Sequence, residues 1–377
     1  MTPSVDNYKV SNSFLEININ LIVNNYQLIN NIVGDAECAA VLKVDAYGMG
    51  ASIISKALDQ AGCSTFFVAT IDEGIKLRAC FEENKNTIAV LSGLLDKSED
   101  VFYENKLTPV LNDIEQIRKW GDFNSLKKIP APCILHIDTG MNRLGLTINE
   151  FEHTVEKSAE LPGLQVGWIM SHLACADQPD DPMNEKQLSL FLNAKKRFPK
   201  VKASLGNSAG IFLGESYHLN MVRPGIALYG SFSGSLPVNP LDQVIKLYSR
   251  ILQIRTLTSG SSVGYGASFR VSKTTRVATV GLGYADGYLR SLSNCSFVFF
   301  NEIRLPVIGR ISMDYITIDI TKIAAEKIKT GDCIEIIGDK FTLDDLASVA
   351  NTVPHEILTG LGTRHHRIYY NTDNSSE

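Results

Sequence analysis

The chain has 377 residues, of which 44% are hydrophobic and 20% are charged, and its formal net charge at pH 7 is −5. This length suits two domains, and the composition is typical of a globular protein. The acidic balance argues against binding to nucleic acid or to an acidic membrane surface. No apolar run is long enough to span a bilayer, and the first ten residues lack the pattern of a secretory signal, so we expect a cytoplasmic protein.

The cysteines show no metal-binding or disulfide pattern. They are scattered, without any C-x-x-C spacing, which argues against a zinc site and against a disulfide framework. Reduced thiols in a cytosolic enzyme are the simpler explanation, and we expect no metal. The seven positions are Cys38, Cys63, Cys80, Cys133, Cys175, Cys295 and Cys333.

Short apolar runs alternate with amphipathic segments from Cys38 to Gly225. The runs are almost continuously apolar, as expected for strands that are buried on both faces. They are Cys38–Lys43, Thr65–Ala69, Thr87–Leu91, Leu107–Leu111, Cys133–Ile137, Val166–Ser171, Val201–Gly206 and Leu219–Arg223.

The segments between these runs carry helix signals. Apolar residues between Ile53 and Ala61 recur at helical spacing and are followed by Gly62, a favoured residue just past a helix end. Asn112 is a candidate N-cap, and Pro182 suits the first helical position. Eight strand–helix alternations predict a (β/α)₈ barrel over residues 1–235. A doubly wound open sheet is the alternative, although the first β–α turn has no G-x-G-x-x-G.

The pattern changes after the barrel. Ser231–Pro240 is rich in Ser, Gly and Pro, as in a linker. Period-2 runs then predict antiparallel strands in a mostly β domain over residues 236–377, and the first residues of the chain are candidates for packing on it. These runs are Lys246–Ile254, Arg276–Gly281, Ile316–Ile320 and Cys333–Ile337.

Lys43 is the most informative residue, because it ends an apolar run and is followed closely by Tyr47 and two glycines. Burial disfavours the ammonium form and yields a nucleophilic amine, which suits Schiff-base chemistry with carbonyl compounds such as pyridoxal phosphate. A lysine at a strand end can also simply extend to water, and for an isolated lysine that is the better interpretation.

The other strand ends favour the chemical interpretation. A barrel gathers its functional residues at the carboxyl ends of its strands, and it commonly binds phosphate after strands seven and eight. Here those two ends carry Asn207-Ser208 and Arg223-Pro-Gly225-Ile226, while strands five and six lead into Asp138–Gly145 and Ser171-His172. An amine at the first strand and a phosphate cradle across the mouth is the arrangement that pyridoxal phosphate requires.

At this point the chain resembles the alanine racemase family, pyridoxal-phosphate enzymes of fold type III with a barrel and a C-terminal β domain. The matching motifs follow one another in order along the chain, and the first and last of them are highly specific together. They are Ala40–Gly50 (AVLKVDAYGMG), Asp138–Gly145 (DTGMNRLG), Ser171–Asp177 (SHLACAD), Asn207–Gly210 (NSAG), Arg223–Gly230 (RPGIALYG), Val263–Ala267 (VGYGA), Gly283–Gly287 (GYADG) and Gly309–Asp314 (GRISMD).

The resemblance implies racemisation of L-alanine to D-alanine, which supplies D-alanine for peptidoglycan. Lys43 would carry the cofactor and act as one acid–base group. Tyr265, from the partner subunit of a homodimer, would be the other, because racemisation needs a group on each face of the α-carbon. A phenol with its ordinary pKa near 10 is a poor base, so neighbouring donors and cations such as Arg143 and His172 would have to assist it.

Further roles follow from the same resemblance. Arg223 would face the pyridine nitrogen, with His172 bracing it, and Arg143 and the Met313 N–H would bind the substrate carboxylate. Tyr284 would lie at the substrate entrance, and Asp314 would orient Tyr265 or stabilise its loop. The cofactor phosphate would be held by Tyr47, Asn207, Ser208, Gly225 and Ile226.

Three positions depart from the family pattern. His136 stands where some members carry a carbamylated lysine that positions the arginine, so Arg143 must be held in another way. Thr363 stands where a tyrosine that contacts the phosphate is expected, and Met49 replaces a usual histidine.

Three alternatives remain. A related barrel decarboxylase of diamino or basic amino acids would pair the pyridine nitrogen with a carboxylate, which Arg223 argues against. A non-catalytic pyridoxal-phosphate carrier would lack the β domain. A racemase with the same chemistry could prefer serine or a broader set of amino acids, because one methylene or hydroxyl contributes only about 1–3 kcal/mol to discrimination.

Overall fold

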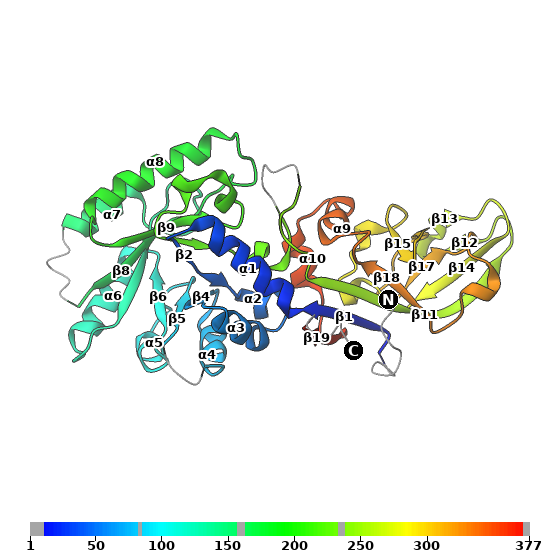
Figure 1. Cartoon of the computed structure of the whole chain (residues 1–377), viewed down its shortest axis with the longest axis horizontal. Helices are drawn as coiled ribbons and strands as arrows, with labels where there is room; N and C mark the ends of the chain where they lie inside the picture. Colours follow the sequence, from blue (N-terminus) through cyan, green and yellow to red (C-terminus); the bar gives the residue numbers. More distant parts are fainter. Residues whose placement is uncertain (1–10, 82–84, 157–162, 233–237, 372–377) are drawn as a thin grey trace. The chain divides into compact units, whose positions relative to one another are not determined.

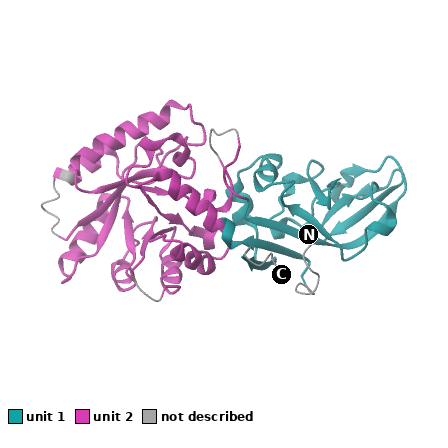
Figure 2. Ribbon diagram, viewed as in Figure 1, with its two compact units in different colours: residues 1–21, 243–377 teal, residues 22–242 magenta. Residues whose placement is uncertain are grey.

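The structure is a computed structural model that describes residues 11–81, 85–156, 163–232 and 238–371. The chain forms two compact units (Figure 2): residues 22–242 form one, and the segments 1–21 and 243–377 form the other. The boundary predicted at 235/236 falls partly on residues outside this description, and the two units divide at 242/243. Among the described helices, none is both long and apolar enough to cross a membrane.

The unit of residues 22–242 is built on a ring of parallel strands (Figure 1), in the order β2-β10-β9-β8-β7-β6-β5-β4-β3. The eight predicted apolar runs correspond to these nine strands, because the first run, Cys38–Lys43, contains parts of two strands, β2 and β3. The strands are β2 (Glu37–Cys38), β3 (Ala40–Val41), β4 (Thr65–Val68), β5 (Thr87–Val90), β6 (Thr108–Leu111), β7 (Pro132–His136), β8 (Gln165–Met170), β9 (Lys202–Asn207) and β10 (Met221–Arg223).

Backbone hydrogen bonds close the ring at the first run. On one side the N–H groups of Ala39 and Val41 donate to the carbonyls of Val222 and Pro224, each at 2.9 Å. On the other side β3 pairs with β4 in parallel. The first apolar run therefore pairs with β10 on one side and with β4 on the other. This closure confirms the predicted barrel and excludes the open doubly wound sheet.

Helices surround the ring (Figure 1), and their ends carry the expected capping chemistry. Pro182 occupies the first turn of its helix, as predicted, with Asp181 as the N-cap. The prediction of Asn112 as an N-cap is wrong: Asp113 caps that helix by accepting from the Gln116 N–H. The helices are α1 (Ile19–Val33), α3 (Ala51–Gln60), α4 (Ile71–Arg78), α5 (Glu99–Glu104), α6 (Ile114–Ser125), α7 (Ile148–Glu156) and α8 (Pro182–Arg197), with short 3₁₀ turns η3 (Gly210–Leu213), η4 (Glu215–Tyr217) and η5 (Ile226–Tyr229).

The second unit is mostly antiparallel β structure, as predicted. Its central strand is β11, which pairs antiparallel with β1, β14 and β18. The parallel pairing of β1 with β19 places the start of the described chain in this unit. Its strands are β1 (Ser13–Asn18), β11 (Ile245–Leu257), β12 (Ser262–Val263), β13 (Phe269–Arg270), β14 (Thr275–Val280), β15 (Phe297–Phe300), β16 (Ile303–Pro306), β17 (Ile316–Asp319), β18 (Cys333–Ile337) and β19 (His366–Tyr370).

The connections of this unit contain short helices. Two of them, α9 and α10, precede the last strand, and the 3₁₀ turns lie in loops between strands. Two of these turns contain residues that the sequence analysis singled out, Tyr265 and Tyr284. The elements are α9 (Leu343–Ala350), α10 (Pro354–Gly360), η6 (Tyr265–Ala267), η7 (Tyr284–Asp286), η8 (Arg290–Leu292) and η9 (Ala325–Lys327).

An aromatic cluster packs two helices of the barrel unit together. Trp120 of α6 is fully buried. Its ring meets Phe102 of α5 edge-on, with centroids 6.2 Å apart, and stacks on Phe123 at 5.8 Å. Burial of rings of this size is among the larger single contributions to a core.

Trp120→Ala should lower the free energy of unfolding of the barrel unit by about 3–5 kcal/mol, because it leaves a cavity among aromatic rings. Leu126→Ala, at a side chain that is 85% exposed, is the control and should cost less than about 0.5 kcal/mol. Trp168 of β8, the other of the chain's two tryptophans, reports unfolding of this unit by fluorescence in urea. Equal losses in the two variants would contradict this packing.

Candidate active site

The segment after β3 has an unusual backbone. The strand ends at Val41, two residues before the predicted end, and Lys43 begins the short helix α2 (Lys43–Tyr47). Residues 44–47 all have φ between 53° and 56°, which makes this turn left-handed. For residues other than glycine this backbone costs about 1–2 kcal/mol each, so contacts from the surrounding structure must hold it.

Hydrogen bonds within the segment give the turn the spacing of a helix. The N–H of Ala46 donates to the Leu42 carbonyl at 2.9 Å, and that of Gly48 donates to the Val44 carbonyl at 2.8 Å. At the far end, the Asp45 carboxylate accepts from the Ala51 N–H at 2.7 Å and so joins the turn to α3. Lys43 thus lies directly before a strained segment that is held by hydrogen bonds.

The surroundings of Lys43 favour a neutral amine. Burial is the largest cause that lowers the pKa of Lys43, the positive charge of Arg143 lowers it further, and the negative charge of Glu73 opposes both. A lysine with a lowered pKa has a larger neutral fraction and is a better nucleophile at a given pH.

Polar groups gather where β9 and β10 end. Ser208 Oγ accepts from the N–H groups of Gly225 and Ala227, at 2.9 and 3.2 Å. Asn207 Oδ1 accepts from the Gly210 N–H at 2.9 Å. The 3₁₀ turn η5 begins at Ile226, directly after Gly225. Backbone amides at the start of such a turn, beside a hydroxyl, form a surface suited to an anion.

Tyr47 extends from the left-handed turn to this same place. A Cβ built on Gly225 would overlap the Tyr47 hydroxyl and come within 3.5 Å of Val41. Only glycine therefore leaves room for the phenol here. Strand one and strand eight are joined at the mouth through this contact, which places Tyr47 beside the amides described above.

Arg223, at the end of β10, is a buried cation that is 4% exposed. It donates to the Ser171 carbonyl at 2.6 Å and to the Leu205 carbonyl at 3.3 Å, and it also bonds Ser204 Oγ. Burial lowers the pKa of Arg223 to about 10, which still leaves it charged at neutral pH. All of these partners are neutral acceptors.

His172 lies beside Arg223, with its Nδ1 3.5 Å from Nη2. Because an arginine can only donate, this contact makes Nδ1 the acceptor and places the imidazole proton on Nε2. Burial, and then the charges of Arg223 and Arg143, hold the pKa of His172 well below its ordinary value. The ring is therefore neutral at physiological pH.

His136 is a second neutral imidazole. Its Nδ1 lies 2.8 Å from Asn112 Oδ1, while the Asn112 amide donates to the Leu91 and Val110 carbonyls. Those two bonds fix Oδ1 as an acceptor, so His136 donates from Nδ1. Burial, followed by the charge of Arg223, lowers the pKa of His136 to about 4.

Arg143 lies in a loop whose conformation is held by hydrogen bonds between residues of the loop itself. Asp138 Oδ1 accepts from the N–H groups of Gly140 and Asn142, at 2.8 and 3.2 Å. The Arg143 side chain is exposed and forms no hydrogen bond or ion pair with any residue that the structure describes. Its charge nevertheless lowers the pKa values of Lys43, His136 and His172, so it lies near all three.

The remaining predicted site residues lie in the other unit. Tyr265, Tyr284 and Met313 are among its exposed large side chains, at 71%, 44% and 54%. Tyr265 stands between Gly264 and Gly266, whose φ angles of 72° and 69° favour glycine and form a tight turn.

Backbone bonds hold two loops of this unit together. The N–H of Tyr284 donates to the Ser312 carbonyl at 3.1 Å, and that of Ala285 donates to the Met313 carbonyl at 3.0 Å. The backbone N–H of Met313 thereby has a fixed position relative to Tyr284.

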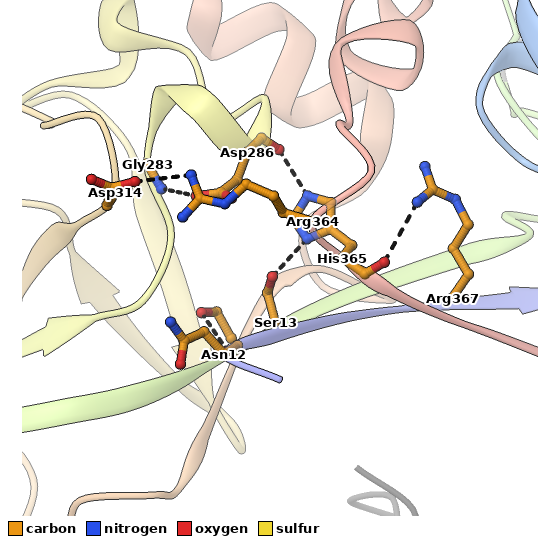
Figure 3. Close-up of polar contacts among 9 residues, drawn as sticks. Asn12, Ser13, Gly283, Asp286, Asp314, Arg364, His365 and Arg367 are labelled. Carbon is orange, nitrogen blue, oxygen red and sulfur yellow. Dashed lines mark hydrogen bonds and ion pairs between the residues drawn. The ribbon is translucent and has the colours of Figure 1, made fainter. Parts of the chain in front are cut away.

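A charge cluster that the sequence analysis did not find supports the same loops (Figure 3). Arg364 forms ion pairs with Asp314, at 2.8 Å, and with the buried Asp286, at 3.2 Å. Asp286 also accepts from the Gly283 N–H at 2.8 Å. The carbonyl of Asp286 lies 2.8 Å from Nε2 of His365, whose Nδ1 lies 2.7 Å from Ser13 Oγ.

The structure thus groups the predicted residues within each unit. The barrel unit brings together Lys43, Tyr47, Arg143, His172, Asn207, Ser208, Arg223, Gly225 and Ile226 at the carboxyl ends of its strands. The β unit holds Tyr265, Tyr284, Met313 and Asp314 on neighbouring loops. Among the described residues, no cluster of His, Cys, Asp and Glu could hold a metal ion.

The buried histidines predict how stability depends on pH. An unfolded histidine titrates near 6.5, whereas His136 in the fold titrates at about 4. Between these values the unfolded chain binds the additional proton, so the unfolding free energy falls as the pH drops from about 6.5, by up to about 1.4 kcal/mol per pH unit. His136→Gln should reduce this slope by about that amount in urea titrations at pH 6.5 to 4.5. The same slope in both proteins would contradict a buried neutral His136.

Comparisons with known proteins give the same family for both parts of the chain. Residues 17–232 match the model of the alanine racemase N-terminal domain, and residues 244–369 match that of the C-terminal domain. An alanine racemase of Rickettsia canadensis is 43% identical over 94% of this chain and 98% of its own length. A catabolic alanine racemase of Agrobacterium fabrum is also 43% identical, over 94% of this chain and 91% of its own.

A solved structure agrees. The alanine racemase of Bartonella henselae, with covalently bound pyridoxal phosphate, matches 96% of this chain and all of that chain, with a TM-score of 0.91 and 40% identity. The chain belongs to the alanine racemase family.

Proposed function

We propose that this chain interconverts L- and D-alanine with pyridoxal 5′-phosphate as its cofactor. The observation that carries the proposal is the mouth of the barrel, where a half-buried lysine with a lowered pKa lies in the same rim as the anion-binding surface at Ser208 and Gly225 and as the buried Arg223. The relatives named alanine racemase, and the Bartonella henselae structure with its covalently bound cofactor, support it.

The residues at the mouth fit this cofactor. Ser208 and the amides around Gly225 would hold its phosphate, with Asn207, Ile226 and the Tyr47 hydroxyl beside them. A side chain at position 225 would occupy the space that the Tyr47 hydroxyl fills, so glycine at this position keeps that hydroxyl beside the phosphate-binding amides. Lys43 would hold the cofactor covalently. When bound, pyridoxal phosphate supplies a carbonyl carbon for an amine and a conjugated ring that withdraws electrons from the substrate α-carbon.

Arg223 would face the ring nitrogen and set its protonation. An arginine that remains charged can donate a hydrogen bond but cannot accept one, so a nitrogen facing it stays unprotonated. His172, neutral and accepting through Nδ1, orients Arg223 without adding a charge. This arrangement limits electron withdrawal into the ring and so disfavours side reactions such as transamination. It also argues against the decarboxylases, which would place a carboxylate at the nitrogen.

Two acid–base groups would act on opposite faces of the α-carbon. Lys43 Nζ would remove or return the proton on one face, and the Tyr265 hydroxyl of a second copy of the chain would do so on the other. Tyr265 is 71% exposed, so its phenol is accessible to another copy. A shared site of this kind requires a homodimer with two-fold symmetry.

Arg143 and the Met313 N–H would bind the substrate carboxylate. Arg143 has no partner among the described residues, so its donors are available to a ligand. The Asp138 loop, rather than a carbamylated lysine, would set its position, because position 136 carries a histidine that bonds Asn112. Asp314, paired with Arg364, would keep the Met313 loop in place, and Tyr284 would line the substrate entrance.

We further propose that the enzyme acts in the cytoplasm and supplies D-alanine for peptidoglycan. A catabolic role is the alternative, as in the Agrobacterium fabrum relative that is named a catabolic alanine racemase. A preference for serine over alanine is the other alternative, and the racemisation assay below tests it by comparing the two amino acids.

The purified chain should racemise L-alanine and show the visible absorption of a lysine-bound pyridoxal phosphate. Lys43→Ala should lose both that band and activity, because it removes the amine that would bind the cofactor. Activity is measured by the appearance of the D enantiomer, with L-alanine and L-serine side by side. Absence of racemisation by a chain that retains the band would overturn the proposed activity, and retention of the band in Lys43→Ala would overturn the role of Lys43.

A further inference from the structure

The left-handed turn after Lys43 is anchored by one carboxylate from outside the segment. Val44, the first residue of the turn in left-handed backbone, donates its N–H to Glu73 Oε1 at 2.7 Å. Glu73 belongs to α4, the helix that follows β4. The bond therefore connects the segment after β3 with the segment after β4, the neighbouring strand of the ring.

The second oxygen of the same carboxylate is fixed independently. Glu73 Oε2 accepts from the Ala69 N–H at 2.7 Å and from the Thr70 N–H at 3.4 Å. The Glu73 N–H donates to Thr70 Oγ1 at 3.3 Å, which completes a capping box at the start of α4. Glu73 is thus held by its own helix through one oxygen and holds the turn through the other.

We propose that Glu73 is a positioning residue for Lys43: by binding the Val44 N–H, it fixes the left-handed turn and thereby the direction of the Lys43 side chain. The inference rests on the proposed function in one respect, because it takes Lys43 to be the catalytic amine. The negative charge of Glu73 also opposes the effect of Arg143 on the pKa of Lys43, so the carboxylate lies near the amine.

Two other capping boxes show that this contact exceeds what a helix cap requires. In α7, Glu150 Oε2 accepts from both the N–H and the hydroxyl of Thr147, at 2.9 and 2.8 Å. In α9, the shorter Asp345 forms the same box with Thr342, at 2.9 Å from its N–H. An aspartate therefore suffices for the cap, and the longer glutamate at position 73 is needed for the additional bond to Val44.

This difference in length separates the two roles experimentally. Glu73→Asp keeps the negative charge and the helix cap, but its carboxylate is one methylene too short to reach both the cap and Val44. Glu150→Asp makes the same change in the box of α7 and is the matched control. Both variants keep the helix cap, so any stability that Glu73→Asp loses beyond that of Glu150→Asp reports on the contact with Val44.

The first measurement is hydrogen–deuterium exchange of the full chain by mass spectrometry. Peptides that cover residues 42–50 should exchange faster in Glu73→Asp than in the wild type, and at the wild-type rate in Glu150→Asp. This readout does not depend on activity. Unchanged protection of residues 42–50 in Glu73→Asp would overturn the proposal.

The second measurement is steady-state kinetics of the holoenzyme with alanine. Glu73→Asp should lower kcat on the order of 10- to 100-fold, because displacement of a reacting group by about 1 Å can cost on the order of 100-fold. The KM should change by less than about twofold, because the proposed carboxylate-binding groups are untouched. A kcat equal to that of Glu150→Asp would also overturn the proposal. If the wild type does not racemise alanine, the proposed function fails, whereas the exchange experiment still tests the contact.

Discussion

The position of one amine depends on a strained stretch of backbone. Four successive residues after Lys43 adopt left-handed angles, and among them Val44, being β-branched, is poorly suited to such angles. The strain is offset by bonds to its backbone and by the carboxylates of Asp45 and Glu73. The same turn carries Tyr47 to the contact with Gly225 at the opposite end of the sheet order. The ring of strands therefore closes at the point where the lysine and the anion cradle must come together.

Electrostatics at the mouth follow from burial. Two arginines, Arg143 and Arg223, lie near Lys43 and two histidines, and burial together with the charges of these arginines lowers the pKa values of both histidines. A carboxylate beside the guanidinium of Arg223 would neutralise it, but its partners are carbonyls and a hydroxyl. The site thus keeps positive charge, which suits the binding of a phosphate and of a substrate carboxylate.

Much of the fold was predictable because its signals are local. Continuous apolar runs predict strands buried on both faces, and all eight runs form strands of the barrel. Lys43, Ser208 and Arg223 were found because the carboxyl ends of parallel strands meet at one rim. The motifs of a known family then added Tyr265 and Met313, which no periodicity would single out.

What the sequence did not reveal depends on tertiary contacts. No local sequence pattern predicts that Val44 adopts left-handed backbone angles. The sequence around Glu73 indicates only an ordinary capping residue of α4. Its second function exists only because β3 and β4 are neighbours in the ring. Arg364 and Asp286 are likewise distant in sequence and meet through the packing of the loop before β19 against the turn that contains Tyr284. The wrong prediction of Asn112 as an N-cap has the same origin, because the Asn112 side chain forms a hydrogen bond with His136 instead of capping a helix.

The central claim is that Lys43 of one chain acts with Tyr265 of another, and mixing two inactive variants tests it most directly. Lys43→Ala and Tyr265→Phe chains, co-expressed with different tags, form mixed dimers in which one site contains both native residues and the other contains neither. If half of the dimers are mixed, about a quarter of the wild-type activity should return in the unfractionated mixture. Mixed dimers that are isolated by both tags and remain inactive would contradict a site shared between two copies.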